Sequence, residues 1–274
     1  MQKTTEIITS RQNPLVSLTA ALSERKHRMR TGLFRFDGKK LLAEAQGAGV
    51  ELHAVLLRES AADTLLDAAA PFSDACRVAI LPDALFDRIS EEKSPEGVIC
   101  VAKRLDKLHK IVTIDKRASF LETLLPGRTL LLESVRDPGN LGTVIRSAAA
   151  FGVPNLVLSS DCADLYHPRA IRGAMGTLFH QHVVVVQDAV DAVRQLTARG
   201  RVFAAALEPH AARLGAVTFG ESDAVAVGNE GHCLSKALLD AATDSIFIPM
   251  ASGVESLNAG VAASVLLWEF YRGR

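Results

Sequence analysis

Apolar runs alternate with amphipathic segments along the whole chain, which is the pattern of an α/β protein. In the first hundred residues the pattern predicts strands over 34–38, 52–58, 76–81 and 97–103. It predicts helices over 12–30, 39–47, 61–70 and 82–89. Strands and helices that alternate in this way indicate a small α/β module with a largely parallel sheet.

The alternation is interrupted over residues 104–128, which begin with a charged stretch and end in LPGR. We therefore expect one domain over 1–106, a linker with a short helix at 116–124 over 107–127, and a second domain over 128–274. In the second domain we expect strands over 129–134, 155–160, 182–186, 201–207, 224–228 and 245–250. We expect helices over 140–151, 168–174, 189–198 and 257–271.

The composition is that of a globular protein, with 48% hydrophobic and 23% charged residues in a chain of 274. No apolar run reaches the roughly 18 residues of a membrane span, and the first residues lack the apolar region of a secretory signal. The four cysteines form no CxxC pair, which disfavours zinc and disulfides. These features predict a cytoplasmic protein without a metal or a membrane partner.

The net charge is zero, but residues 1–40 hold nine basic and three acidic residues. The run 25–30 is the most cationic part of this stretch, and it is either a phosphate-binding surface or a solvated helix end. The candidate RNA contacts in it are Arg25, Lys26, Arg28 and Arg30.

Three loops of the second domain follow predicted strands, where open α/β sheets bind ligands. The first, 134–152, contains the turn Asp137–Asn140 and a helix with Arg146 among small and apolar neighbours. An arginine in such surroundings needs an acidic partner or a ligand. Asn140 lies near the helix start, where its side chain is a candidate cap.

The second loop, 228–235, contains Gly228 and Gly231, whose lack of a side chain lets main chain approach a flat ligand. Its Glu230 is a candidate hydrogen-bond acceptor. The third segment, 248–271, contains Ser256 just before the last helix, where a serine also serves as an ordinary cap. No loop has the GxGxxG, GxxxxGK[ST], HExxH or GxSxG pattern, which disfavours a dinucleotide, a nucleoside triphosphate, a catalytic zinc and a serine nucleophile.

In order and spacing, the three segments resemble the SpoU (TrmH-type) branch of the SPOUT RNA methyltransferases. Asn140 with Arg146 is similar to the first family motif, GNEG at 228–231 to the second, and 249–264 to the third. The N-terminal module resembles the family's small, ribosomal-protein-like substrate-binding domain. Two positions depart from the family pattern, since Cys233 stands where glycine is usual and Ala174 where serine is frequent.

The resemblance implies a SPOUT-type α/β domain with a deep trefoil knot, a fold that binds S-adenosylmethionine, after a small α/β RNA-binding domain. It implies 2′-O-methylation of a ribose, with Arg146 stabilising the alkoxide. The residues it implies for positioning are Asn140, Glu230, Ser256 and Asn258. Those it implies around the cofactor are Leu207, Gly228, Asn229, Gly231, Ile248, Met250 and Leu257. A homodimer is also implied.

Ribosomal RNA is the favoured substrate, because the N-terminal module resembles a ribosome-associated fold. Transfer RNA remains the alternative, and methylation of a base atom is a further one. A non-catalytic RNA-binding protein on the same fold is a different class, which need not bind S-adenosylmethionine. A nucleotide-dependent enzyme of small metabolites would need a phosphate-binding glycine loop, and DPGNLG has the wrong spacing for one.

Overall fold

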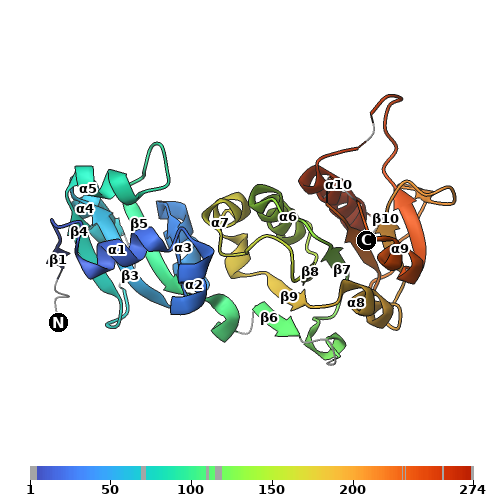
Figure 1. Ribbon diagram of the computed structural model, residues 1–274, viewed down its shortest axis with the longest axis horizontal. Coiled ribbons are helices and arrows are strands. Elements are labelled where there is room, and N and C mark those ends of the chain that lie inside the picture. The colour runs from blue at the N-terminus through green and yellow to red at the C-terminus, as the bar shows by residue number, and fades with distance from the viewer. Residues whose placement is uncertain are drawn as a thin grey trace. The chain divides into compact units, whose positions relative to one another are not determined.

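The computed structural model describes residues 5–68, 72–108, 111–114, 119–229, 231, 233–254 and 256–272. The chain forms two compact units (Figure 1). Unit 1 comprises Met1–Leu108 and Tyr166–Phe179, and unit 2 comprises His109–Leu165 and His180–Arg274. The domains predicted from the sequence, 1–106 and 128–274, differ from these units, because residues 166–179 belong to unit 1.

Unit 1 contains a five-stranded sheet in the order β1-β4-β3-β5-β2. Its strands are β1 Glu6–Ile7, β2 Leu33–Asp37, β3 Leu52–Arg58, β4 Arg77–Leu81 and β5 Val98–Lys103. The prediction of a largely parallel sheet is right for β1, β4 and β3 but wrong for β5, which runs antiparallel to β3 and β2. Alternating apolar residues of these strands form the core, as in the fully buried Leu56 and Ile99.

Along the chain, helices alternate with these strands in unit 1. They are α1 Pro14–Ala21, α2 Arg25–Thr31, α3 Lys39–Gly47, α4 Ala62–Ala68 and α5 Asp83–Ile89, with 3-10 turns η1 Glu59–Ala61 and η2 Leu105–Leu108. The single helix predicted over 12–30 is two helices, because the chain turns at Leu22–Glu24. The guanidinium of Arg28 donates to the Leu22 and Ser23 carbonyls at 2.7 and 2.6 Å, and so satisfies acceptors that the end of α1 leaves open.

Residues 166–179 complete unit 1, although they lie between two strands of unit 2 in the sequence. They contain α7 Pro168–Ala174 and the turn η4 Thr177–Phe179. The ring of Tyr166 lies 4.9 Å from that of Phe34, and the ring of Phe179 lies 5.3 Å from that of Phe36. The Tyr166 hydroxyl accepts from Leu105 N at 2.8 Å. Unit 1 is therefore discontinuous in sequence.

Unit 2 is built on an eight-stranded sheet in the order β11-β13-β10-β12-β7-β8-β9-β6, and all its neighbouring strands are parallel. Its strands are β6 Ile111–Ile114, β7 Thr129–Leu132, β8 Asn155–Ser159, β9 His182–Val186, β10 Val202–Ala205, β11 Ala212–Arg213, β12 Ala224–Val227 and β13 Asp244–Phe247. Strand β6 lies in the predicted linker. Within the described part of 116–124, the expected helix is only the turn η3 Leu121–Thr123.

Helices cover this sheet, and their starts are fixed by side-chain caps. They are α6 Pro138–Ala150, α8 Ala189–Leu196, α9 Lys236–Ala241 and α10 Ala259–Arg272. Asp137, Asp188 and Ser235 accept from main-chain N–H groups at the starts of α6, α8 and α9. Helices α6 and α10 pack side by side (Figure 1). The trefoil knot stays a prediction. Among the described helices, none is long and apolar enough to cross a membrane.

Candidate active site

A pocket lies in unit 2 at the carboxyl ends of three neighbouring strands. Strands β13, β10 and β12 are adjacent and parallel, so the loops that follow them emerge at the same edge of the sheet. The loop after β13 and the start of α10 close the remaining side. The lining residues are Ala205, Ala206, Leu207, Val227, Gly228, Asn229, Cys233, Ile246, Phe247, Ile248, Met250, Ser256, Leu257, Ala259 and Ala262. The wall is therefore mostly main chain and small or apolar side chains.

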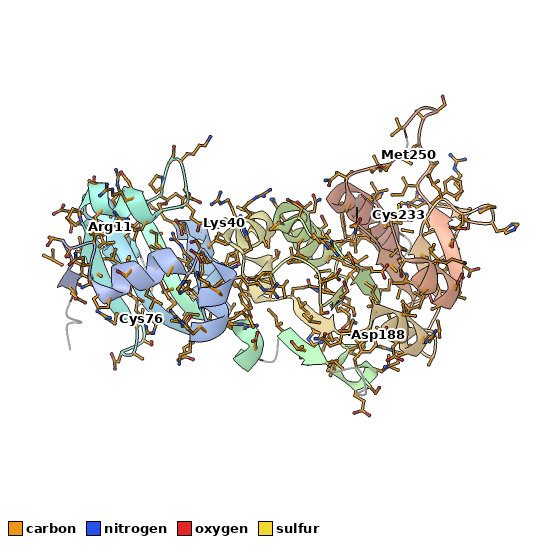
Figure 2. All side chains as sticks on the ribbon, viewed as in Figure 1. Arg11, Lys40, Cys76, Asp188, Cys233 and Met250 are labelled. Carbon is orange, nitrogen blue, oxygen red and sulfur yellow. The ribbon has the colours of Figure 1, made fainter. Side chains whose placement is uncertain are left out.

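The β12–α9 loop folds back over Gly228, and this fold leaves no room for a side chain there. A Cβ on Gly228 would lie 2.2 Å from the carbonyl carbon and oxygen of Cys233. Cys233 itself has φ of +54°, and its N–H donates to the Asn229 carbonyl at 3.1 Å. This φ explains why glycine is the usual residue at position 233 of the family pattern. Figure 2 labels Cys233 and Met250 at the same end of unit 2, and both line the pocket.

The structure gathers most of the residues that the sequence proposed for the cofactor. Those that line the pocket are Leu207, Gly228, Asn229, Ile248, Met250 and Leu257. Gly231 is not among the lining residues. Its N–H donates to Asn229 Oδ1 at 2.9 Å in an exposed turn, so it shapes the loop. Cys233, named from the sequence only as a departure from the family pattern, also lines the pocket. The lining residues that were not predicted lie at the ends of predicted strands, which could have indicated them: Ala205, Ala206, Val227, Ile246 and Phe247.

Two candidate residues from distant segments meet beside this pocket. Asn258 Nδ2 donates to Asn140 Oδ1 at 2.9 Å, which joins the start of α10 to the first turn of α6. Asn258 Oδ1 also accepts from Gly260 N at 3.0 Å, so the side chain caps α10. A Cβ on Gly260 would lie 3.4 Å from Asn140 Oδ1 and from Thr143 Cβ. Glycine at position 260 therefore allows the two helices to approach closely.

Arg146 lies on α6 with an exposed side chain. Among the described residues it has no hydrogen-bond or ion-pair partner, so its charge is available to a ligand. Ser256 lines the pocket together with Leu257. Glu230, the remaining residue proposed for the chemistry, lies outside the described residues.

The loop before α6 is held by an aspartate. Asp161 accepts from Ser134 Oγ at 2.6 Å, from Ser159 Oγ at 2.6 Å and from Arg136 at 3.1 Å. Partial burial alone would raise the pKa of Asp161, but these hydrogen bonds together lower it. Ser134 has φ of +56°, and these contacts hold it in that conformation. The carboxylate thus fixes the approach to α6 and Asn140.

The cationic segment proposed to bind RNA lies on α2 of unit 1. Arg25, Lys26 and Arg30 are exposed. Arg28 is only 2% exposed, because its guanidinium is used by main-chain carbonyls of the preceding turn. The expectation that Arg28 joins this surface is therefore corrected. The linear pattern of basic residues did not reveal which of them faces the core.

No group of three His, Cys, Asp or Glu side chains among the described residues is placed to hold a metal ion. The four cysteines are free thiols, and only Cys233 is exposed. Burial raises the pKa of the Cys162 thiol, which lies at the end of β8.

A parallel sheet with a main-chain-walled pocket at its carboxyl edge is the arrangement of an α/β enzyme domain. The chain belongs to the SpoU rRNA methylase family, whose profile matches residues 127–268. An MRM3-like substrate binding domain matches residues 13–100. The predicted family and α/β fold class are therefore confirmed.

Relatives of known name match over nearly the whole chain. The 23S rRNA (guanosine(2553)-2′-O)-methyltransferase RlmP of Bacillus subtilis is 30% identical, with 95% of this chain and 97% of the relative covered. The S-adenosylmethionine-bound rRNA methyltransferase of Sinorhizobium meliloti superposes with a TM-score of 0.82 at 25% identity, over 98% of both chains. AviRb of Streptomyces viridochromogenes, in complex with the same cofactor, has a TM-score of 0.76 at 25% identity, over 95% of this chain and 98% of its own.

Proposed function

We propose that this protein is an S-adenosylmethionine-dependent rRNA methyltransferase that modifies a ribose 2′-hydroxyl. The observation that carries the proposal is the convergence of three distant segments on unit 2: the loops after β10, β12 and β13 form one pocket, and the Asn140–Asn258 bond joins α6, which bears Arg146, to its edge. The relatives support this assignment, because the name of RlmP specifies 2′-O-methylation of 23S rRNA and the structures from Sinorhizobium meliloti and Streptomyces viridochromogenes contain the cofactor.

The pocket fits the cofactor by its chemistry. Gly228 contributes only main chain to the pocket wall, because the fold of the loop leaves no room for a side chain there. Apolar side chains of Ile248, Met250 and Leu257 line the same space, which suits a purine and a short aliphatic chain. When bound, S-adenosylmethionine supplies a methyl group activated by its sulfonium.

Arg146 is the residue we assign to the chemical step. As its oxygen is methylated, a ribose hydroxyl releases its proton to water, and a fixed cation stabilises the negative charge that develops on that oxygen. Arginine keeps its own proton, because its pKa is above about 12. Asn140 and Asn258 act with it by holding the start of α10 against α6. Ser256 lines the pocket, and Glu230 completes the proposed set.

Substitution of Arg146 tests the assignment. We expect Arg146→Ala to lower the rate of ribose methylation by about 100-fold or more, because one group that stabilises the transition state is lost. Binding of S-adenosylmethionine, measured by calorimetry, should be unchanged. Arg194→Ala removes another exposed arginine of unit 2 and is the matched control. Wild-type turnover in Arg146→Ala would remove this residue from the mechanism, and a wild-type protein that binds no cofactor would favour a non-catalytic RNA-binding protein.

Unit 1 is proposed to bind the RNA through Arg25, Lys26 and Arg30 of α2. Each phosphate contact that is lost should lower the slope of log K against log salt by about 0.7 to 0.9. The triple alanine variant is therefore expected to bind an rRNA fragment more weakly and with a smaller salt slope, whereas Arg88→Ala on α5 should not. An unchanged slope would exclude this surface. Comparison of rRNA with tRNA from cells with and without the protein, by mass spectrometry, distinguishes the two substrates.

We also propose a homodimer that works in the cytoplasm. Trp268 and Tyr271 of α10 are 48% and 49% exposed, and their rings pack with Phe151 at 5.8 and 6.0 Å. An exposed aromatic cluster of this kind suits an interface. The free thiols suit a reducing compartment. Trp268→Glu should lower the mass measured by light scattering if the cluster is the interface.

A further inference from the structure

Glu133 holds both ends of the loop that forms one wall of the cofactor pocket. It is the first residue after β7, and its main-chain N–H donates to the Val227 carbonyl at the end of β12, at 2.9 Å. Its carboxylate accepts twice from Ser235, at 2.7 Å from the main-chain N–H and at 2.7 Å from the hydroxyl. Val227 and Ser235 are the residues on either side of the loop 228–234. The residue that follows β7 is thus bonded to the residues on both sides of this loop.

The strand register explains this position. Leu132 is paired with Val227 in the parallel β7–β12 ladder, so the next residue on β7 lies beside the first residue of the loop. Two further bonds lie within the loop: Cys233 N donates to the Asn229 carbonyl, and Gly231 N donates to Asn229 Oδ1. Those bonds shape the turn without joining it to the sheet.

From these contacts we infer that Glu133 is a positioning residue for cofactor binding. The inference rests on the proposed function, since the loop matters only if the pocket takes the cofactor. Its hydrogen bonds are between a carboxylate and neutral donors, which are stronger than neutral pairs. Without them the C-terminal end of the loop loses its hydrogen bonds to the residue after β7, and Gly228, Asn229 and Cys233 are held less firmly in the pocket wall. Among the described residues, the Glu133 carboxylate bonds to Ser235 and to none of the residues that line the pocket, so its effect is exerted through Ser235.

The chain contains a reporter of this loop. Cys233 is exposed and lines the pocket, whereas Cys76, Cys100 and Cys162 are buried. The reaction of the native protein with a thiol reagent therefore measures the accessibility of the loop. Addition of S-adenosylmethionine should slow this reaction in the wild-type protein, because the cofactor covers the cysteine.

The test compares Glu133→Ala, Glu133→Gln and Ser235→Ala with Glu122→Ala, which removes an exposed glutamate from the same unit. We expect Glu133→Ala to raise the Kd and the KM for S-adenosylmethionine about tenfold or more, the effect of losing hydrogen bonds to a charged group. The kcat at saturating cofactor should be kept, and the cysteine should react faster. Glu133→Gln keeps one acceptor and one donor for Ser235, so it should recover most of the affinity.

A double-mutant cycle gives the decisive outcome. If Glu133 acts through Ser235, the effects of the two alanine substitutions on the Kd are not additive. Additive effects, or a Kd equal to that of Glu122→Ala in a variant that still folds, would overturn the inference. A Glu133→Ala variant that loses kcat at saturating cofactor while its Kd is unchanged would also overturn it. Absence of cofactor binding in the wild-type protein would instead contradict the proposed function itself.

Discussion

Replacement of Cys233 by glycine should stabilise the protein, which is unusual for a residue in a ligand pocket. Among the described non-glycine residues, only Ser134, Met175 and Cys233 have a positive φ. At Cys233 the value is +54°, in the left-handed region, where a Cβ lies too close to the neighbouring carbonyl oxygen. The side chain is exposed, so little packing is lost when it is removed.

The magnitude follows from two opposing terms. The left-handed conformation costs an L-residue about 1 to 2 kcal/mol. Glycine recovers this cost but loses more backbone entropy on folding, by roughly 0.5 to 1 kcal/mol. The proper reference is Cys233→Ala, which removes the thiol but keeps the Cβ. We therefore expect Cys233→Gly to be more stable than Cys233→Ala by about 0.5 to 1 kcal/mol, or about 1 to 4 °C in Tm for a unit of this size.

Urea and thermal unfolding of the two variants, under reducing conditions, measure this difference. Glu221 provides the control, because it is an exposed turn residue without a positive φ. At that position the glycine variant should be less stable than the alanine variant. A Cys233→Gly variant that is no more stable than Cys233→Ala would refute the argument, since it would mean that the loop does not keep this φ in solution. Cofactor affinity should be equal or higher in the glycine variant.

Two further predictions concern other parts of the fold. Tyr166→Phe removes the oxygen that accepts from Leu105 N and donates to Asp106, so unit 1 should lose about 1 to 3 kcal/mol of unfolding free energy; equal stability in urea would show that these two hydrogen bonds do not stabilise unit 1. Burial lowers the pKa of His182 below 6.5, so the unfolded chain takes up the proton first as the pH falls. Its stabilising contribution is present above pH 6.5 and lost below it, and His182→Gln should flatten the loss of stability between about pH 7 and 5; an unchanged slope would contradict this assignment.

The regular part of the fold follows from the sequence because it depends on local patterns. The helix Pro168–Ala174 and the strand His182–Val186 have the predicted bounds. Strands β1 and β11 each contain two residues, too few for any period to be visible. Strand β6 lies within residues 107–127, which the sequence pattern assigned to a linker. Such edge strands exist through pairing with distant partners, as β6 does with β9, and a local pattern contains no such information.

The division into units failed for a related reason. Residues 166–179 have the helix predicted for them, but their apolar side chains complete the core around Phe34 and Phe36, more than a hundred residues earlier. The sequence pattern predicts that Tyr166 and Phe179 are buried, but it does not show in which of the two units they are buried. The same limit applies to Arg28, whose partners are the carbonyls of a helix end that the predicted continuous helix did not contain.

The candidate site shows which kinds of functional residue a sequence reveals. Gly228 could be proposed from the sequence because a glycine that ends a predicted strand lets main chain approach a ligand, and it lies where a Cβ would meet the main chain of Cys233. Glu133 was not conspicuous, since a glutamate after a strand is ordinary. Its role arises because the register of β7 and β12 brings it beside a loop that is distant in the chain. There its carboxylate accepts hydrogen bonds from Ser235, 102 residues later. Residues that contact a ligand leave a compositional trace, whereas residues that position them are found through the pairing of strands.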